Sequence, residues 1–260
     1  MPQAPYLRVL GSCDWLPGPQ NDGACYTLSD HLLIDTGWHA DAEICDAGLD
    51  FCRLSAILLT HYHADHLLGL PALLMRWRIL RGGFQGLTLA GPAECLTEAF
   101  QHAHALIAFG DEDVRAMPPP RLIPLHPGDI FEINGEQIRC ERALHPVPAL
   151  SYCITHRATG HRIGLSGDTA YQATHAALFQ NVSLLVHECT QGEKIPDPLH
   201  VTCAHHSTAL DAARMANACN AQHLLLTHAR TTRKAGSLQA AAQIASCPIA
   251  WAEPGQIFPY

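Results

Sequence analysis

Short runs of apolar residues, separated by polar turns, predict β-strands through the first third of the chain. These strands are expected over residues 6–13, 24–27, 31–35, 56–60 and 87–90. Apolar residues at helical spacing predict a helix over 67–80, with Pro71 in its first turns, where proline is tolerated. A second helix is expected over 93–109, and the prolines after Met117 predict a stiff connector.

Two hairpins are predicted next, and then helices and strands alternate. The first hairpin covers 129–144 around Asn134-Gly135, and the second joins 151–155 to 161–166. Helices are expected over 170–180, 208–220 and 237–245, with strands over 183–187, 223–227, 248–252 and 256–258. Strands lead each half and helices follow, which predicts two sheets packed face to face with helices outside.

Composition limits the class of protein. The length of 260 residues, 48% of them hydrophobic, favours one large domain over residues 1–260. A net charge of −8 disfavours a broad basic surface for nucleic acid. The 11 cysteines are scattered without a CxxC pair, and neither a signal peptide nor an 18-residue apolar stretch is apparent. We therefore expect a cytoplasmic protein with reduced thiols and no membrane contact.

Histidine is unusually abundant, with 18 residues, and its placement suggests chemistry. The segment from Thr60 to His66 reads THYHADH and lies between a predicted strand and a predicted helix. Left uncompensated, its imidazoles and carboxylate would place polar groups at the mouth of a buried strand. The spacing offers His61 and His63 to one metal ion, and Asp65 and His66 to another. Such ligands suit Zn²⁺, with Mn²⁺ or Fe as competitors. A solvated His-rich loop is the alternative.

This HxHxDH loop resembles the hallmark of the metallo-β-lactamase superfamily, and the resemblance continues in order along the chain. Asp35 resembles the early aspartate that supports the metal loop. The resemblance implies a four-layer αββα sandwich, an α+β fold of two mixed sheets with helices outside, and two divalent metal ions. It assigns His61, His63 and His145 to one ion, Asp65, His66 and His228 to the other, and Asp168 to the bridge between them.

Two further motifs resemble those of ribonuclease Z, which trims tRNA 3′ ends. They are VHECT, which contains Glu188, and HHSTA, which contains His206. The resemblance implies that Glu188 pairs with His206 and that this histidine protonates the leaving oxygen. Alternatively, His206 merely precedes a helix that begins at Thr208 with Ser207 as its cap. The neighbouring His187 and His205 are expected to be packing or surface residues.

The chain also departs from ribonuclease Z. His145 and Asp168 are only 23 positions apart, so the arm that commonly clamps tRNA between them is missing. Together with the negative charge, this disfavours a large RNA substrate. The chain is closer in length to arm-less relatives of ribonuclease Z that cleave small phosphodiesters. Arg76, Arg78 and Arg81 either meet a phosphate or form a solvated helix face, and both interpretations stay open.

The resulting prediction is a dinuclear phosphodiesterase for cyclic nucleotides or cyclic phosphates, which acts by attack of a metal-bound hydroxide. Asp65, His206 and Glu188 are the candidate catalytic residues. The alternatives are a tRNA 3′-processing endoribonuclease, a lactone, thioester or β-lactam hydrolase, and a non-catalytic metal-binding protein. Relatives are often dimers, so a homodimer is also considered.

Overall fold

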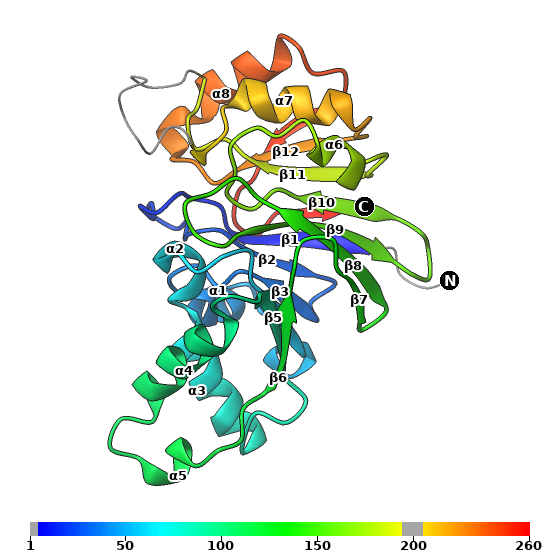
Figure 1. Ribbon diagram of the computed structural model, residues 1–260. Coiled ribbons are helices and arrows are strands. Elements are labelled where there is room, and N and C mark those ends of the chain that lie inside the picture. Colours follow the sequence, from blue (N-terminus) through cyan, green and yellow to red (C-terminus); the bar gives the residue numbers. More distant parts are fainter. Residues whose placement is uncertain (1–4, 194–204) are drawn as a thin grey trace.

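Two seven-stranded sheets pack face to face and carry helices on both outer sides (Figure 1). The computed structural model describes residues 5–193 and 205–260. The first sheet contains β1 (Tyr6–Gly11), β2 (Cys25–Leu28), β3 (Leu32–Ile34), β4 (Ala56–Leu58), β5 (Thr88–Pro92), β6 (Arg121–Leu125) and β14 (Ile257–Pro259). The second contains β7 (Ile130–Ile133), β8 (Glu136–Arg142), β9 (Leu150–His156), β10 (Arg162–Leu165), β11 (Leu184–Glu188), β12 (Leu224–Thr227) and β13 (Ile249–Trp251).

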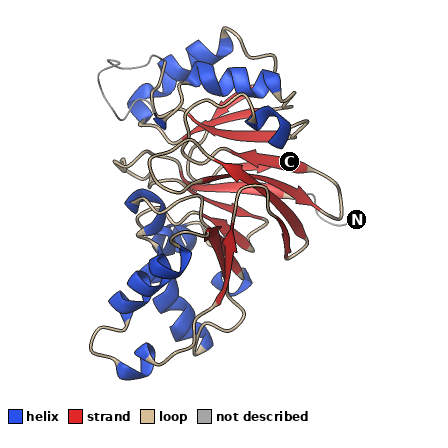
Figure 2. Cartoon of the chain, viewed as in Figure 1, coloured by secondary structure: helices blue, strands red, loops and turns tan. Residues whose placement is uncertain are grey.

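The helices form the two outer layers, which Figure 2 shows above and below the strands. They are α1 (Ala40–Asp46), α2 (Ala64–Leu67), α3 (Leu70–Arg81), α4 (Leu96–Ile107), α5 (Glu112–Arg115), α6 (His175–Leu178), α7 (Ala209–Ala218) and α8 (Lys234–Ala242). The first five lie beside the first sheet and the last three beside the second (Figure 1). This is the four-layer αββα arrangement that was predicted.

Three apolar clusters hold the layers together. The central cluster lies between the sheets, and the other two join each sheet to its own helices. In β3, Leu32 and Ile34 belong to the central cluster, whereas Leu33 between them faces the helices. Alternate residues of a strand point to opposite faces, so a strand buried on both sides is apolar throughout.

Both sheets are mixed. The first runs in the order β14-β1-β2-β3-β4-β5-β6, and its pairs from β3 to β6 are parallel. The second runs in the order β13-β12-β11-β10-β9-β8-β7, and its pairs from β10 to β13 are parallel. The carboxyl ends of parallel strands share one edge of a sheet, and loops at that edge commonly form binding sites.

Some predicted elements differ from the observed ones. The helix expected over 170–180 is only α6, because the preceding residues are held as a loop. There, the Thr169 amide donates to Glu188 (2.8 Å) and the Ala170 amide donates to the Leu144 carbonyl (3.0 Å). The helix expected over 67–80 is α3, which begins only at Leu70, because Ala64–Leu67 form the separate short helix α2 and a Cβ on Gly69 between them would clash with the Thr36 carbonyl oxygen. Helices α1 and α5 were not predicted.

None of the helices within residues 5–193 and 205–260 is both long and apolar enough to cross a membrane.

Candidate active site

The histidines and acidic residues selected from the sequence meet at one rim of the sandwich, where strands of both sheets end. His61 follows β4 of the first sheet. Asp168 follows β10, Glu188 ends β11, and His228 follows β12, all in the second sheet. Segments more than 150 residues apart in sequence therefore supply one cluster of side chains.

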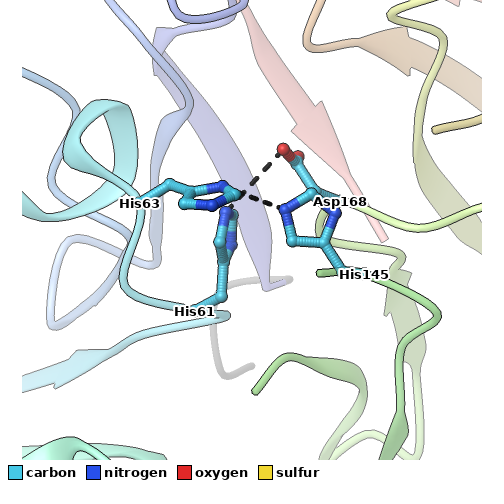
Figure 3. Close-up of side chains that lie close together, drawn as sticks. All are labelled: His61, His63, His145 and Asp168. Atoms are coloured by element: carbon cyan, nitrogen blue, oxygen red, sulfur yellow. Dashed lines mark hydrogen bonds and ion pairs between the residues drawn. The ribbon is translucent and has the colours of Figure 1, made fainter. Parts of the chain in front are cut away.

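One group comprises His61, His63, His145 and Asp168, whose potential ligand atoms all lie within 4.8 Å of one another (Figure 3). The His145 Nε2 lies 3.0 Å from the His63 Nδ1. The His61 Nε2 lies 3.8 Å from the Asp168 Oδ2. Three imidazoles and one carboxylate thus surround a single point, an arrangement suited to Zn²⁺ and similar ions.

A second group comprises Asp65, His66 and His228. The Nε2 atoms of His66 and His228 are 3.0 Å apart, and the His228 Nε2 is 3.2 Å from the Asp65 Oδ2. Asp168 lies between the groups, because its Oδ1 is 3.5 Å from the His66 Nε2 while its Oδ2 faces His61. The structure therefore brings together all seven residues that the sequence suggested as metal ligands.

Two threonine hydroxyls fix the tautomers of two of these histidines. The Thr60 hydroxyl donates its proton to Asp35 (2.7 Å), so at 3.0 Å it accepts one from the His61 Nδ1. The Thr190 hydroxyl donates to the His228 carbonyl (2.8 Å), so at 2.8 Å it accepts from the His228 Nδ1. Each ring therefore carries a proton on Nδ1, on the side away from the cluster, and presents its Nε2 to the cluster.

Two further histidines are oriented by oxygens that only accept hydrogen bonds. The His66 Nδ1 donates to the Asp35 carboxylate (2.8 Å), and the His145 Nδ1 donates to the His205 carbonyl (3.2 Å). Asp35 also accepts from the Thr60 amide (2.7 Å), so it braces the loop as the sequence predicted. Protein oxygens on the far side of each ring are typical of histidines that bind metals.

The cluster also contains buried polar atoms that make no hydrogen bond with any described residue. They are the His61 Nε2 and the Asp168 Oδ1, on residues that are 0% and 2% exposed. A buried polar atom that lacks a hydrogen bond costs about 1–3 kcal/mol. A cation held by each group would satisfy these atoms, one at the His61 Nε2 and the other at the Asp168 Oδ1, and the donor set therefore fits metal ions.

The charges in the cluster favour the ligand forms of the first group. Burial lowers the pKa of His61 well below its usual range and the pKa of His145 to about 4. For Asp168, burial alone would raise the pKa, but the charges of His228 and His66 hold it well below its usual value. Neutral imidazoles and ionised carboxylates are the forms that bind cations.

In the second group, nearby carboxylates raise the pKa values of the histidines instead of leaving them lowered by burial. Burial opposes the charge on His66, but the carboxylates of Asp168 and Asp35 raise its pKa well above the usual value. For Asp65, burial is outweighed by the hydrogen bond from His228 and the charge of His66, and its pKa falls to about 2. The carboxylates thus create a negative site that attracts positive charge.

Glu188 and His206 form a pair beside this cluster. The His206 Nδ1 lies 2.9 Å from the Glu188 Oε1 and 3.9 Å from the Asp168 Oδ2. Burial lowers the pKa of His206, but the charge of Glu188 and its hydrogen bond raise the pKa to about 9. The helix after His206 begins with Thr208 as its N-cap, and not with Ser207. His206 also belongs, with Asp168 and His228, to a third group that could hold an ion.

A hollow of about 700 Å³ opens next to the cluster. His63, Asp65, Asp168, His206 and His228 line it, and among the described residues its walls also include Trp15, Trp38, Arg230 and Arg233. Sequence reasoning missed the aromatic and basic residues, as well as the roles of Thr190 and the His205 carbonyl. No local pattern identifies these contacts, because their partners are distant in sequence.

The three arginines that follow the HxHxDH loop, Arg76, Arg78 and Arg81, contact residues outside the candidate active site. Arg76 forms an ion pair with Asp41, and the Arg78 Nη2 lies 3.2 Å from Asp111. Arg81 donates to the Cys52 carbonyl and stacks over Trp77. These contacts favour the interpretation of the three arginines as a structural helix face.

Comparisons with known proteins agree with this geometry. The model of the beta-lactamase superfamily domain matches residues 31–229. A ribonuclease Z from Haloarcula marismortui is 28% identical, over 86% of either chain. The metallo-beta-lactamase fold protein YhfI from Bacillus subtilis has a TM-score of 0.81 at 22% identity, covering 98% of this chain and 99% of its own. A diphosphatase from the PhnP family has a TM-score of 0.71 at 18% identity, covering 98% of both chains. The predicted fold is confirmed.

Proposed function

This chain belongs to the beta-lactamase superfamily and is a metal-dependent hydrolase, and we propose that its substrates are small phosphodiesters such as cyclic nucleotides or cyclic phosphates. The observation that carries the proposal is the Glu188–His206 pair at the edge of the hollow. An alkoxide leaves a phosphodiester only with difficulty unless an acid protonates it, and this pair supplies such an acid.

The proposed metal ligands follow the two groups of side chains. His61, His63 and His145 would hold one ion, Asp65, His66 and His228 would hold the other, and Asp168 would be shared between them. The mixture of imidazoles and carboxylates favours zinc, with manganese and iron as competitors. When bound, such ions supply a water-derived nucleophile at neutral pH and offset the negative charge on the phosphoryl oxygens.

The chain's own residues complete the reaction. Asp65, at the wall of the hollow, accepts a hydrogen bond from the attacking hydroxide, whose other proton has already been lost to solvent, and orients it toward phosphorus. As the new P–O bond forms, the bond to the leaving oxygen breaks. His206 donates the Nε2 proton to that oxygen, because its Nδ1 is held by Glu188. Glu188 is thus a positioning residue that keeps the imidazole protonated and correctly turned.

Several features support a small substrate. The hollow has the volume of a site for a nucleotide-sized molecule, since such pockets measure about 300–1,000 Å³. The chain between His145 and Asp168 forms only strands β9 and β10 and their connections. The net charge of −8 would oppose binding of a long polyanion.

A parallel assay on the metal-loaded protein tests the substrate class. It compares a cyclic nucleotide, bis(p-nitrophenyl) phosphate, precursor tRNA, a thioester, a lactone and a β-lactam. We expect the highest kcat/KM on the small phosphodiesters. A preference for any of the carbonyl substrates would overturn the proposal.

The leaving-group role of His206 needs a separate test. His206→Ala should retain the metal content but lose about 100-fold or more in kcat with an alkyl leaving group, and much less with p-nitrophenolate, which leaves without a proton. His102→Ala, on the exposed side of α4, is the matched control. Unchanged turnover of the alkyl ester would refute the acid role, and loss of metal would indicate that His206 is a ligand.

Ribonuclease Z activity is the second candidate, because relatives of that name align with most of this chain. It predicts that precursor tRNA exceeds all small esters in kcat/KM. The same parallel assay decides between the two candidates.

A further inference from the structure

The wall of the hollow next to the proposed metal ligands contains an exposed aromatic ring. Trp15 lies on the loop after β1 and is 58% exposed. An indole is a large apolar surface that is normally covered, and in a binding site such a ring serves as a contact for flat groups. Its place in a hollow also lined by Asp168 and His206 means that one ligand can touch both regions.

The indole ring contacts a guanidinium that is itself held in place. The guanidinium carbon of Arg230 lies 5.9 Å from the centre of the Trp15 ring. Arg230 in turn donates through Nε to Asp14 (3.2 Å), a carboxylate that is almost completely buried. Asp14 also accepts from the Leu16 amide (3.0 Å). These contacts orient the ring without covering most of it, so they create a platform rather than a packed core residue.

The platform is fixed to the segment that carries His228. The Ser12 carbonyl, just before Asp14, accepts a hydrogen bond from the Ala229 amide (3.3 Å). Arg230 follows two residues after His228. A group stacked on Trp15 would therefore have a defined position relative to the reacting phosphate.

The same wall carries positive charge. Arg233 also lines the hollow, donates to the Thr190 carbonyl, and forms no ion pair with any described residue. Because Arg230 is neutralised by Asp14, Arg233 is the cation on this wall that is available to an anion. An aromatic platform beside an unpaired guanidinium is the combination that binds a base and its phosphate.

We propose that Trp15, supported by Arg230 and Asp14, is the subsite for the nucleobase of a nucleotide substrate. The inference rests on the proposed phosphodiesterase function and narrows it from small phosphodiesters in general to those that carry a base. The aromatic face accepts any base, because stacking does not depend on its hydrogen-bonding edge. Trp15 is accordingly a specificity residue that binds the part of the substrate away from the scissile bond.

Two substrates with the same scissile bond test this subsite. They are adenosine 2′,3′-cyclic phosphate and methyl ribofuranoside 2′,3′-cyclic phosphate, in which a methoxy group replaces the base. For the metal-loaded protein we expect a higher kcat/KM with the nucleotide. Trp15→Ala should reduce kcat/KM for the nucleotide by about 5- to 150-fold and leave the methyl riboside nearly unchanged. Trp15→Phe should restore much of the preference.

Leu16→Ala is the matched control, since Leu16 is a neighbouring apolar residue with 42% exposure that does not line the hollow. Titration calorimetry with adenosine monophosphate gives a readout that is independent of turnover, and Trp15→Ala should weaken this binding as well. If neither cyclic phosphate is hydrolysed, the proposed function fails, whereas the calorimetric comparison still tests the subsite.

Equal ratios of the two kcat/KM values in the wild type and in Trp15→Ala would overturn the subsite. A Trp15-dependent preference for p-nitrophenyl esters without any preference for nucleotides would also overturn the assignment to a nucleobase.

Discussion

Glu136 at the start of β8 should make stability depend on pH, although it is remote from the candidate active site. Its side chain is completely buried, and neither carboxylate oxygen has a hydrogen-bond partner among the described residues. The His31 Nε2, 3.9 Å away, and the nearby Tyr260 hydroxyl are also buried and lack partners there. Burial raises the pKa of Glu136 to about 7.

The sign of the effect follows from this raised pKa. In the unfolded chain a glutamate loses its proton near pH 4.5, whereas in the folded protein Glu136 keeps it until about pH 7. Its contribution to stability is therefore fully present below pH 4.5 and is lost as the pH rises through 7. At 1.36 kcal/mol per pH unit, the shift from 4.5 to about 7 corresponds to a loss of about 3 kcal/mol.

Urea denaturation between pH 5 and 8 checks this expectation by comparing wild type with Glu136→Gln. The amide stays neutral, so the free energy of unfolding of the variant relative to wild type should increase by roughly 2.5 kcal/mol over this range. Comparison at each pH, with excess metal, cancels the contribution of bound ions. Glu132→Gln is the control, because Glu132 is exposed and pairs with Arg157 at the surface. A difference that stays constant with pH would refute the reasoning.

Three further predictions concern the rim. Asp168→Ala removes the carboxylate between the two ligand groups, so the purified protein should contain less than its full complement of metal, measured by elemental analysis; full metal content would contradict the bridging role. Thr190→Val removes the acceptor that fixes the His228 tautomer and should weaken metal binding by about 10- to 100-fold in a competition with a chelator. Gly167→Ala should lower the free energy of unfolding by about 1–3 kcal/mol, because Gly167 has φ +57° and a Cβ there would lie 3.0 Å from the Thr60 Cβ. Gly160→Ala, at φ +75° in open space, should cost less.

The HxHxDH loop was predictable because its residues are close together in sequence and follow an apolar strand. Local spacing alone suggests that His61 and His63 act together. It gives no indication that His66 meets His228, which is 162 positions away and 3.0 Å distant in the structure. That pairing was suggested by the family resemblance, and physically it results from the convergence of strand ends from two sheets.

For the arginines, proximity in sequence was misleading about function. Arg76, Arg78 and Arg81 form a conspicuous cluster in the sequence, but their partners belong to other segments that only the fold brings near. Trp15 and Arg230 are inconspicuous in sequence because they are 215 positions apart, and the fold makes them neighbours. A local sequence pattern indicates which residues lie on the same helix or strand. It does not indicate which distant residue of opposite charge pairs with a given arginine.

The burial of Glu136 could not be predicted, although the turn beside it was predicted correctly. The Asn134-Gly135 turn lies where the sequence indicated, between β7 and β8, and a glutamate next to a turn is normally exposed. The turn instead lies against the first sheet, where the Asn134 amide donates to the Ser55 hydroxyl (2.6 Å). Packing between the sheets therefore determines the environment of Glu136, and its charge behaviour could not be predicted from its neighbours in sequence.

Backbone conformation links the cluster at the rim to a cost in stability. Asp35 and His228, which follow the ends of β3 and β12, have φ angles of +53° and +54°. A residue other than glycine in this region costs about 1–3 kcal/mol and persists only where other contacts hold it. The Asp35 carboxylate is held by Thr60 and His66, and the His228 ring is held by Thr190. The strained backbone directs the His228 ring into the cluster and the Asp35 carboxylate to the residues that brace it, so the fold gives up local stability where it assembles the proposed metal site.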